Sequence, residues 1–315
     1  MKITRGLGEH KRSPYPVLTI GNFDGQHRGH QALLQTVVRT AAKTDGTPMV
    51  LTFDPHPITV LRPGLELSLL TPLEEKLTRF QDAGIEEVLF LTFNAALSAL
   101  TPEEFVHHVL GEGIGVKELF VGRQFAFGKG RAGHMDDLLR LSAQNGFRVH
   151  AVAPVLVDGE VVSSTRVRQL VQAGELRAAA HCLGRPYGFN GTVVTGAQRG
   201  QSLGWPTANL HLPRGLALPP DGVYATMAHW RGNRLASASY IGTRPTFDAG
   251  ERLLEVHLLD QRVQLYGQEI RVEFIERIRG DLRCDSAQEL SARIELDVRL
   301  AREALAGPPQ TLAEA

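Results

Sequence analysis

The chain has 315 residues, 43% of them hydrophobic and 22% charged, which is enough for about two domains with buried cores. Lysine plus arginine and aspartate plus glutamate both number 34, and this zero net charge counts against a protein that grips long nucleic acids through a basic surface. The two cysteines lie far apart and the N-terminus lacks an apolar segment, so we expect a cytoplasmic protein without membrane spans, disulfide bonds or a cysteine zinc site.

The first half of the chain alternates short apolar runs with segments of helical period. This alternation predicts a parallel sheet with helices on both faces. Ligands bind such sheets at the carboxyl ends of the strands, where the strand order reverses. In chain order we expect strands over 16–24, 48–54, 86–93 and 117–122, helices from residue 28 and over 72–84 and 101–110, and a hairpin over 155–163 followed by a helix.

After residue 188 the spacing of apolar residues changes to a period of two. The segments with this period are separated by Gly, Asn and Asp, and they are GVYATMAHW, RLASASYIG, RLLEVHLLD and IRVEFIERI. Short, evenly spaced strands predict a closed or nearly closed barrel. A last helix is indicated by apolar residues at steps of three and four, namely Ala287, Leu290, Ile294, Val298, Ala301 and Leu305. We therefore predict two domains, 1–184 and 185–315.

The segment GNFDGQHRGH (21–30) joins the first of these strands to its helix. Its glycines let the backbone turn tightly, and the first amides of the helix form an anion site. His27 and His30 lie one turn apart around Gly29, which leaves room for a base or phosphate, and both rings could donate to a phosphate in the transition state. The alternative is that the histidines only cap the helix or face solvent. The strand-end context, Asn22 and the glycines favour the phosphate site.

The segment VSSTRVR opens the helix after the hairpin. The hydroxyls of Ser164 and Thr165 could bind phosphate oxygens, while Arg166 and Arg168 supply positive charge. A helix cap with a solvated basic face is the alternative.

Two further loops follow predicted strands. FDPHP fixes His56 between prolines, either as a rigid turn or as a ligand contact. VGRQFAFGKGRAG combines Phe125 and Phe127 with basic residues, which suits a stacked base or flavin ring with phosphates. The two phenylalanines equally suit a core at strand spacing, so both interpretations stay open.

The barrel half contains GTVVTGAQRGQSLGWPTANL, a glycine-rich loop followed by a proline. Backbone amides of such a loop can wrap a polyphosphate. Thr207 and Asn209 share one face of an extended segment and offer hard oxygen ligands for Mg²⁺, although a proline-led turn also explains them. In RLLEVHLLD, Glu255 and His257 lie opposite the apolar set. If that face lines a cavity, Glu255 could accept a proton from a hydroxyl, and if it faces water it is an ordinary strand charge.

Taken in order, these motifs resemble the prokaryotic bifunctional riboflavin kinase/FAD synthetase family. GNFDGQHRGH looks like the HxGH signature of the nucleotidyltransferase superfamily, and VSSTRVR looks like its second phosphate-binding motif. PTANL, LEVHLLD and LYGQEIRVEFIERIR match the riboflavin kinase domain, and the similarity runs from about residue 16 to about residue 305. The resemblance implies an α/β, Rossmann-like nucleotidyltransferase domain with a parallel sheet, then a six-stranded β-barrel with a terminal helix.

The resemblance also implies the chemistry. Riboflavin would be phosphorylated to FMN with ATP and Mg²⁺, and FMN would be adenylylated to FAD with release of pyrophosphate. His27, His30 and Glu255 would be catalytic, with Glu255 the base that activates the ribityl 5′-hydroxyl. The adenylyltransferase would bind ATP through Asn22, Gly29, Ser164, Thr165 and Arg168. The kinase would bind ATP through Gly196, Arg199, Gly200, Thr207 and Asn209, and Thr207 and Asn209 would also hold the metal. Flavin would contact His56, Phe125, Phe127 and Arg244.

Four positions depart from the family pattern. Gln124 and His134 stand where acidic residues (or, at 124, asparagine) are common, Tyr240 replaces a frequent asparagine, and Cys284 a phenylalanine. We expect riboflavin, FMN, FAD and ATP as partners and neither nucleic acid nor membrane, with self-association left open. A barrel that only binds flavin, and a nucleic-acid binder, are the alternatives.

Overall fold

The structure, a computed structural model, describes residues 1–194, 204–243, 252–261 and 263–306. The chain divides into two compact units, Met1–Ser164 and Thr165–Ala315. The boundary predicted at residue 185 follows α7 (Ser164–Ala173) and α8 (Leu176–Leu183). Four predicted site residues lie outside the described residues: Gly196, Arg199, Gly200 and Arg244.

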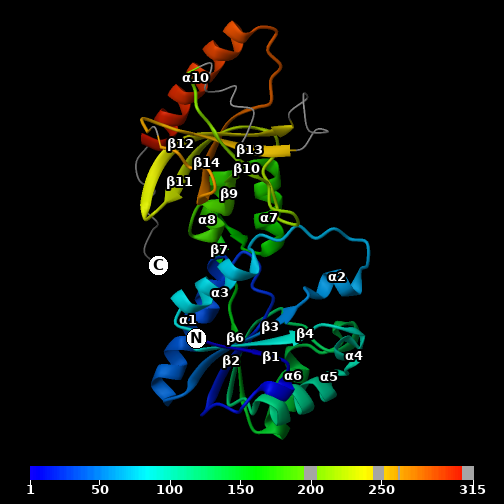
Figure 1. Cartoon of the computed structure of the whole chain (residues 1–315). Coiled ribbons are helices and arrows are strands. Elements are labelled where there is room, and N and C mark those ends of the chain that lie inside the picture. Colours follow the sequence, from blue (N-terminus) through cyan, green and yellow to red (C-terminus); the bar gives the residue numbers. More distant parts are fainter. Residues whose placement is uncertain (195–203, 244–251, 262, 307–315) are drawn as a thin grey trace. The chain divides into compact units, whose positions relative to one another are not determined.

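The first unit is built on a six-stranded parallel sheet, as predicted (Figure 1). The four expected strands are present, and each is a run of buried apolar residues. Two strands at the sheet edges were not predicted: one is four residues long and mostly exposed, and the other has no fully buried residue. The strand order is β1 (Lys2–Arg5), β4 (Glu87–Thr92), β3 (Thr47–Asp54), β2 (Pro16–Ile20), β5 (Glu118–Gly122) and β6 (Arg148–Val152).

Helices cover both faces of this sheet. On one face, α1 (Arg28–Thr44) and α3 (Leu73–Asp82) share a core with alternate residues of β2, β3 and β4. On the other face, η2 (Phe105–Ile114) and α6 (Met135–Asn145) pack on the intervening strand residues. The prediction of a doubly covered sheet is therefore confirmed. The remaining short elements of this unit are η1 (Leu7–Glu9), α2 (Pro57–Leu61), α4 (Ala95–Ala99), α5 (Pro102–Glu104), η3 (Lys129–Arg131) and the predicted hairpin β7 (Leu156–Val157)–β8 (Glu160–Val161).

The helix expected over 101–110 has an unusual form. It begins as one α-helical turn, α5, which Thr101 and Glu104 cap reciprocally. It then continues for ten residues as a π-helix, η2, and ends at Gly115, whose φ is 72°. A π-helix of this length is rare and is often associated with function.

The order of the parallel strands reverses between β2 and β5. From β2 the chain builds β3 and β4 on one side, then returns to add β5 and β6 on the other. The loops after β2, β3 and β5 therefore meet at one edge of the sheet, which is where ligands bind in this architecture. These loops carry GNFDGQHRGH, FDPHP and GRQFAFG.

The second unit contains a closed antiparallel barrel, again as predicted (Figure 1). Tyr224, Phe189 and Phe274 fill it, and the tyrosine and Phe274 rings meet edge to face at 5.4 Å. The terminal helix α10 (Ala287–Ala306) packs on it through Val298 and Ala301. The strands, in barrel order, are β10 (Ala208–His211), β13 (Arg252–Leu258), β12 (Asn233–Thr243), β11 (Gly222–Trp230), β14 (Glu269–Gly280) and β9 (Tyr187–Val194).

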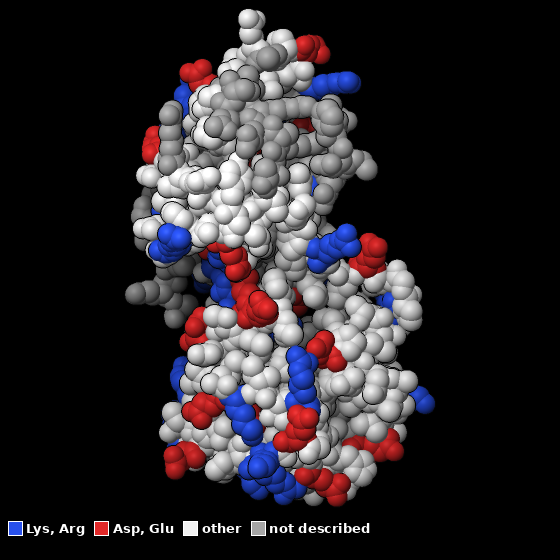
Figure 2. All heavy atoms as spheres, viewed as in Figure 1, with Lys and Arg blue, Asp and Glu red and all other residues white. Residues whose placement is uncertain are grey.

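Surface charge is mixed in sign. On the face drawn in Figure 2, basic and acidic side chains are interspersed over the described residues. This distribution agrees with the equal numbers of basic and acidic residues in the sequence. It does not resemble the basic stripe that tracks a nucleic-acid backbone.

Candidate active sites

The loop after β2 holds an uncommon backbone conformation. Phe23, Gly25 and Gln26 have φ values of 51°, 82° and 40°, so two residues with side chains occupy the left-handed region. Such backbone is costly and is found where surrounding contacts fix it, often at functional sites. Phe23 provides one of those contacts, because it is 1% exposed and its ring lies 5.1 Å from the ring of His30 and 5.3 Å from that of Phe80.

His27 and His30 lie together, as predicted from their spacing. Their rings stack with centroids 3.7 Å apart and planes 17° from parallel. The backbone N–H of His30 donates to His27 Nδ1 at 3.3 Å, so the neutral His27 ring carries its proton on Nε2. Gly29 has a role that the sequence did not indicate: a Cβ there would lie 3.2 Å from the His27 ring, so the glycine makes room for that ring.

His30 is held in its neutral form. Burial, followed by the nearby His27 and Lys76, lowers the pKa of His30 well below its ordinary value. Its Nδ1 is buried without a hydrogen-bond partner among the described residues, and the same is true of Asn22 Oδ1. Buried polar atoms left unpaired are uncommon, and two of them within residues 21–30 indicate a place where a ligand supplies the partners.

Asp24 organises the segments around the histidines. Its side chain is buried and accepts hydrogen bonds from the backbone N–H groups of Leu70 at 2.8 Å and Thr71 at 3.2 Å, just before α3. Its carbonyl oxygen accepts from Ser164 Oγ at 2.7 Å. The second predicted phosphate motif therefore meets the histidine loop through Ser164. In the second unit, Thr165 is exposed and Arg168 half-buried.

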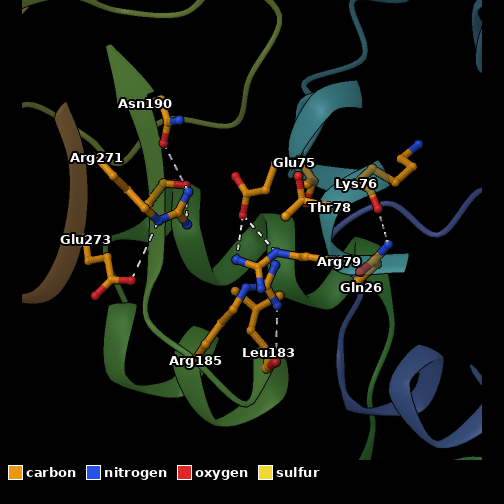
Figure 3. A network of polar contacts seen from close by, with 12 residues as sticks. Gln26, Glu75, Lys76, Thr78, Arg79, Leu183, Arg185, Asn190, Arg271 and Glu273 are labelled. Atoms are coloured by element: carbon orange, nitrogen blue, oxygen red, sulfur yellow. Dashed lines mark hydrogen bonds and ion pairs between the residues drawn. The ribbon is translucent and has the colours of Figure 1, made fainter. Parts of the chain in front are cut away.

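Lys76 is a candidate that sequence reasoning missed. It lies on α3, is only 8% exposed, and its carbonyl accepts from Gln26 Nε2 at 2.9 Å (Figure 3). In Figure 3 its ammonium points away from Arg79 and Glu75, which pair with each other on the other side of the helix. Burial lowers the pKa of Lys76, and the charges of Asp24 and Asp54 oppose that shift.

The ammonium of Lys76 has no hydrogen bond or ion pair with any residue in the described part of the chain. A buried cation without such a partner is unfavourable unless something else compensates it. Its sequence signal is its place on the apolar stripe of α3, three residues after Leu73 and four before Phe80.

The other two loops of this edge hold the predicted flavin contacts. His56 caps α2, with its Nδ1 accepting from the Ile58 N–H at 3.3 Å. Phe125 and Phe127 stack at 5.6 Å, but they differ in burial. Phe127 is 6% exposed and belongs to the core beside Phe105, whereas Phe125 is half-buried and keeps accessible surface.

In the barrel, predicted residues form a row across three strands. In the ladders, Asn209 of β10 is directly opposite Glu255 of β13, which is in turn opposite Tyr240 of β12. Thr207 Oγ1 lies 3.5 Å from Glu255 Oε2, and Asn209 is 2% exposed. A hydroxyl, an amide oxygen and a carboxylate are the hard oxygen donors that suit Mg²⁺, so the residues present fit the expected metal.

The predicted alternation of β13 is confirmed. Leu254, Val256 and Leu258 are buried, while Glu255 and His257 are half-buried on the opposite face. His257 Nδ1 lies 2.8 Å from the carbonyl oxygen of Pro206 and so attaches β13 to the turn that carries Thr207.

A cavity of about 440 Å³ has Thr207 in its lining. Thr207 is the member of the predicted site that lines it, and neither Glu255 nor Asn209 does. Its other walls include the apolar side chains of Val256, Leu258 and Tyr266. The volume and lining are of the kind that bury a flat organic ring.

Comparison with known proteins agrees with this division of sites. The family model described as FAD synthetase matches residues 9–166, and that described as riboflavin kinase matches residues 183–305. A bifunctional riboflavin kinase/FMN adenylyltransferase of Escherichia coli K12 is 39% identical over 96% of this chain and 97% of its own length. One of Pseudomonas fluorescens is 38% identical over 98% and 99%. The chain belongs to the bifunctional riboflavin kinase/FMN adenylyltransferase family. As a member it is a transferase with both activities.

A solved structure also shares the fold. The crystal structure of a protein of Streptococcus pneumoniae, named a macrolide-efflux protein, matches with a TM-score of 0.87 and 28% identity over 96% of this chain and 99% of that one. In the part of the present chain that the structure describes, no helix is both long and apolar enough to cross a bilayer.

The four residues that differ from the family pattern lie in different surroundings. Tyr240, opposite Glu255, donates a hydrogen bond to Asp281 Oδ1 at 2.9 Å, and burial with that bond raises its pKa. Gln124 is exposed, and His134 caps α6. Cys284 is a half-buried free thiol.

Proposed function

We propose that this chain makes FMN from riboflavin in its barrel and FAD from FMN at the edge of its parallel sheet, with one ATP used at each step. The observation that carries the proposal is the presence of two separate polar constellations, one in each unit. The first is the stacked histidine pair with unpaired buried polar atoms beside it. The second is the row of Asn209, Glu255 and Tyr240 with Thr207 beside it.

In the adenylyl transfer, a phosphate oxygen of FMN attacks the α-phosphorus of ATP. That P–O bond forms as the bond to pyrophosphate breaks, so negative charge moves toward the leaving group. His27, through Nε2–H, and neutral His30 donate to these phosphate oxygens. Asn22, Ser164, Thr165 and Arg168 hold the ATP, and Gly29 leaves room for the His27 ring.

We assign Lys76 to the same step. Its charge lies near both Asp24, in the histidine loop, and Asp54, at the end of β3, so it stands between the segments assigned to ATP and to flavin. Its ammonium, which lacks a hydrogen-bonding partner among the described residues, would bind the phosphate of FMN or the α-phosphate that it attacks. His56 and Phe125 orient the flavin, and Phe127 supports Phe125 from the core.

In the kinase reaction, Glu255 accepts the proton of the ribityl 5′-hydroxyl as that oxygen attacks the γ-phosphorus of ATP. Thr207 and Asn209 would hold Mg²⁺, which neutralises charge on the transferred phosphoryl group when bound. His257 maintains the geometry by attaching β13 to the Pro206 turn. Gly196, Arg199 and Gly200, with Arg244, remain our predictions for the triphosphate and flavin contacts.

The cavity lined by Thr207 fits the adenine ring of the kinase's ATP. Tyr266 offers a flat ring face, and Val256 and Leu258 are apolar lining residues. Tyr266→Ala should raise the KM for ATP in FMN formation and leave the KM for riboflavin unchanged. A change confined to riboflavin would assign the cavity to the flavin instead.

Purified protein supplied with riboflavin, ATP and Mg²⁺ should form FMN first and FAD later, as resolved by chromatography over time. If neither product formed, the proposal would be refuted. We place the enzyme in the cytoplasm, a location that suits a chain with two widely spaced cysteines.

A further inference from the structure

The π-helix η2 brings together three metal-binding side chains that neither activity uses. His107, His108 and Glu112 each offer a ligand atom, and these atoms all lie within 4.8 Å of one another. His107 Nε2 is 3.5 Å from Glu112 Oε1, and His108 Nδ1 is 2.9 Å from Glu112 Oε2. All three side chains are more than half exposed, so an ion could reach them from solvent.

The π-helical geometry is what makes this cluster. In an α-helix a residue faces its neighbours three and four positions along, so Glu112 would meet His108 but not His107. In a π-helix the backbone bonds run from residue i to i+5, which also brings His107 within reach of Glu112. Glu112 can therefore contact both His108, four positions before it, and His107, five positions before it.

The hydrogen bonds around His107 leave two acceptors facing each other. Asn145 Nδ2 donates to the Leu141 carbonyl at 2.9 Å, so its Oδ1 is the atom that faces His107 Nδ1, at 3.2 Å. Because Oδ1 only accepts, His107 Nδ1 carries the proton of the neutral ring. Nε2 of the neutral ring therefore presents a lone pair toward an oxygen of Glu112, and a cation between the two atoms would bind both.

A metal-bound histidine commonly donates its second N–H to a carbonyl or carboxylate oxygen, as His107 does to Asn145. The glycine at position 111 permits this contact, since a Cβ there would lie 3.0 Å from Asn145 Oδ1. The nearby Arg12 donates to the backbone carbonyl of Glu112, not to its carboxylate.

We propose that His107, His108 and Glu112 form a binding site for a divalent transition-metal ion, with Zn²⁺ the best match. Two imidazoles and one carboxylate are a common zinc ligand set, with a water as fourth ligand. Zinc bonds of about 2.0–2.2 Å place neighbouring ligand atoms somewhat over 3 Å apart, between the 2.9 Å that separates His108 from Glu112 and the 3.5 Å that separates His107 from Glu112. Mg²⁺, which the two activities use, prefers oxygen ligands and would not compete here.

The test is a titration of the full-length, untagged protein, freed of metal by a chelator and kept without nucleotide. Zn²⁺ and Co²⁺ are added at pH 8, so that protons compete little with the metal for imidazole nitrogens. Calorimetry follows both metals and visible absorption follows Co²⁺. We expect about one equivalent of metal bound, and a spectrum of Co²⁺ with nitrogen and oxygen ligands.

The variants separate this site from adventitious binding. His107→Ala and Glu112→Gln should each weaken binding by about 100-fold or more, and Asn145→Ala by about 10–100-fold, since it orients a ligand. His134→Ala, at the opposite end of α6, is the matched control and should bind as the wild type does. FMN and FAD formation in each variant checks its folding. The proposal is overturned if the wild type binds neither metal, or if His107→Ala and Glu112→Gln bind as tightly as the wild type.

Discussion

Replacing Lys76 by methionine tests the adenylyl-transfer site most sharply among single changes. Methionine keeps much of the apolar stem and removes the charge. If the ammonium contacts a phosphate in the transition state, its loss should lower kcat/KM for FAD formation by about 10²–10³, the range for losing one preorganised donor. FMN formation from riboflavin, measured in the same sample, should not change.

The stability of this variant separates a functional lysine from a structural one. The Lys76 ammonium makes no hydrogen bond or ion pair with the described residues, and burial already lowers its pKa. Its removal should therefore leave the free energy of unfolding unchanged within about 1 kcal/mol, or raise it. Lys43→Met, which removes an exposed lysine of α1, is the control and should affect neither activity.

The pH dependence adds a third readout. Because the pKa of Lys76 is lowered, the ammonium loses its charge at a lower pH than an ordinary lysine does. FAD formation by the wild type should fall on the alkaline side below pH 10.5, and Lys76→Arg, if active, should not show that fall. If Lys76→Met makes FAD normally, or if it loses FAD formation only because it unfolds, the reasoning about Lys76 is refuted.

Three further changes test other parts of the account. The pKa of His30 is lower in the folded chain than in the unfolded chain, so between these two pKa values the unfolded chain binds more protons and the folded state loses stability as the pH falls below about 6.5. Thermal melts of His30→Gln should show a smaller loss of stability over this pH range than those of the wild type. An equal loss of stability would contradict the burial of a neutral His30 ring. Asp24→Asn weakens the two hydrogen bonds that the Asp24 side chain accepts from backbone N–H groups, and it should lower the free energy of unfolding in denaturant by about 1–3 kcal/mol. FAD formation should fall and FMN formation should not change. Unaltered stability would mean that the loop does not depend on this carboxylate. Asp297→Ala leaves Arg279 without its carboxylate and should destabilise the barrel by about 3 kcal/mol, whereas a change under about 0.5 kcal/mol would show the pair to be unimportant.

Much of the fold could be predicted because the pattern of apolar residues along the sequence reports which residues are buried. The inner strands of the sheet are continuous apolar runs, and β13 alternates between Leu254, Val256 and Leu258 inside and Glu255 and His257 outside. The edge strands β1 and β6 were missed because strands with at most one fully buried residue carry little apolar pattern. The π-helix was expected only as a helix, since its apolar spacing does not reveal which carbonyl each N–H reaches.

Some residues of the candidate sites could be predicted from local sequence motifs and others could not. His27, His30 and Glu255 stand in local motifs whose spacing is visible in the chain. The contacts of Lys76 and Asp24 depend on segments 46 or more residues apart, and local pattern does not report such contacts. An unexpected lysine on an apolar helix stripe was the one available signal.

The central claim, two independent ATP-using sites in one chain, is tested most directly by a product time course with two variants. His27→Ala should accumulate FMN and make no FAD. Glu255→Gln should make no FMN from riboflavin yet make FAD when FMN is supplied. With the protein folded, failure of His27→Ala to make FMN from riboflavin, or failure of Glu255→Gln to make FAD from supplied FMN, would contradict the account.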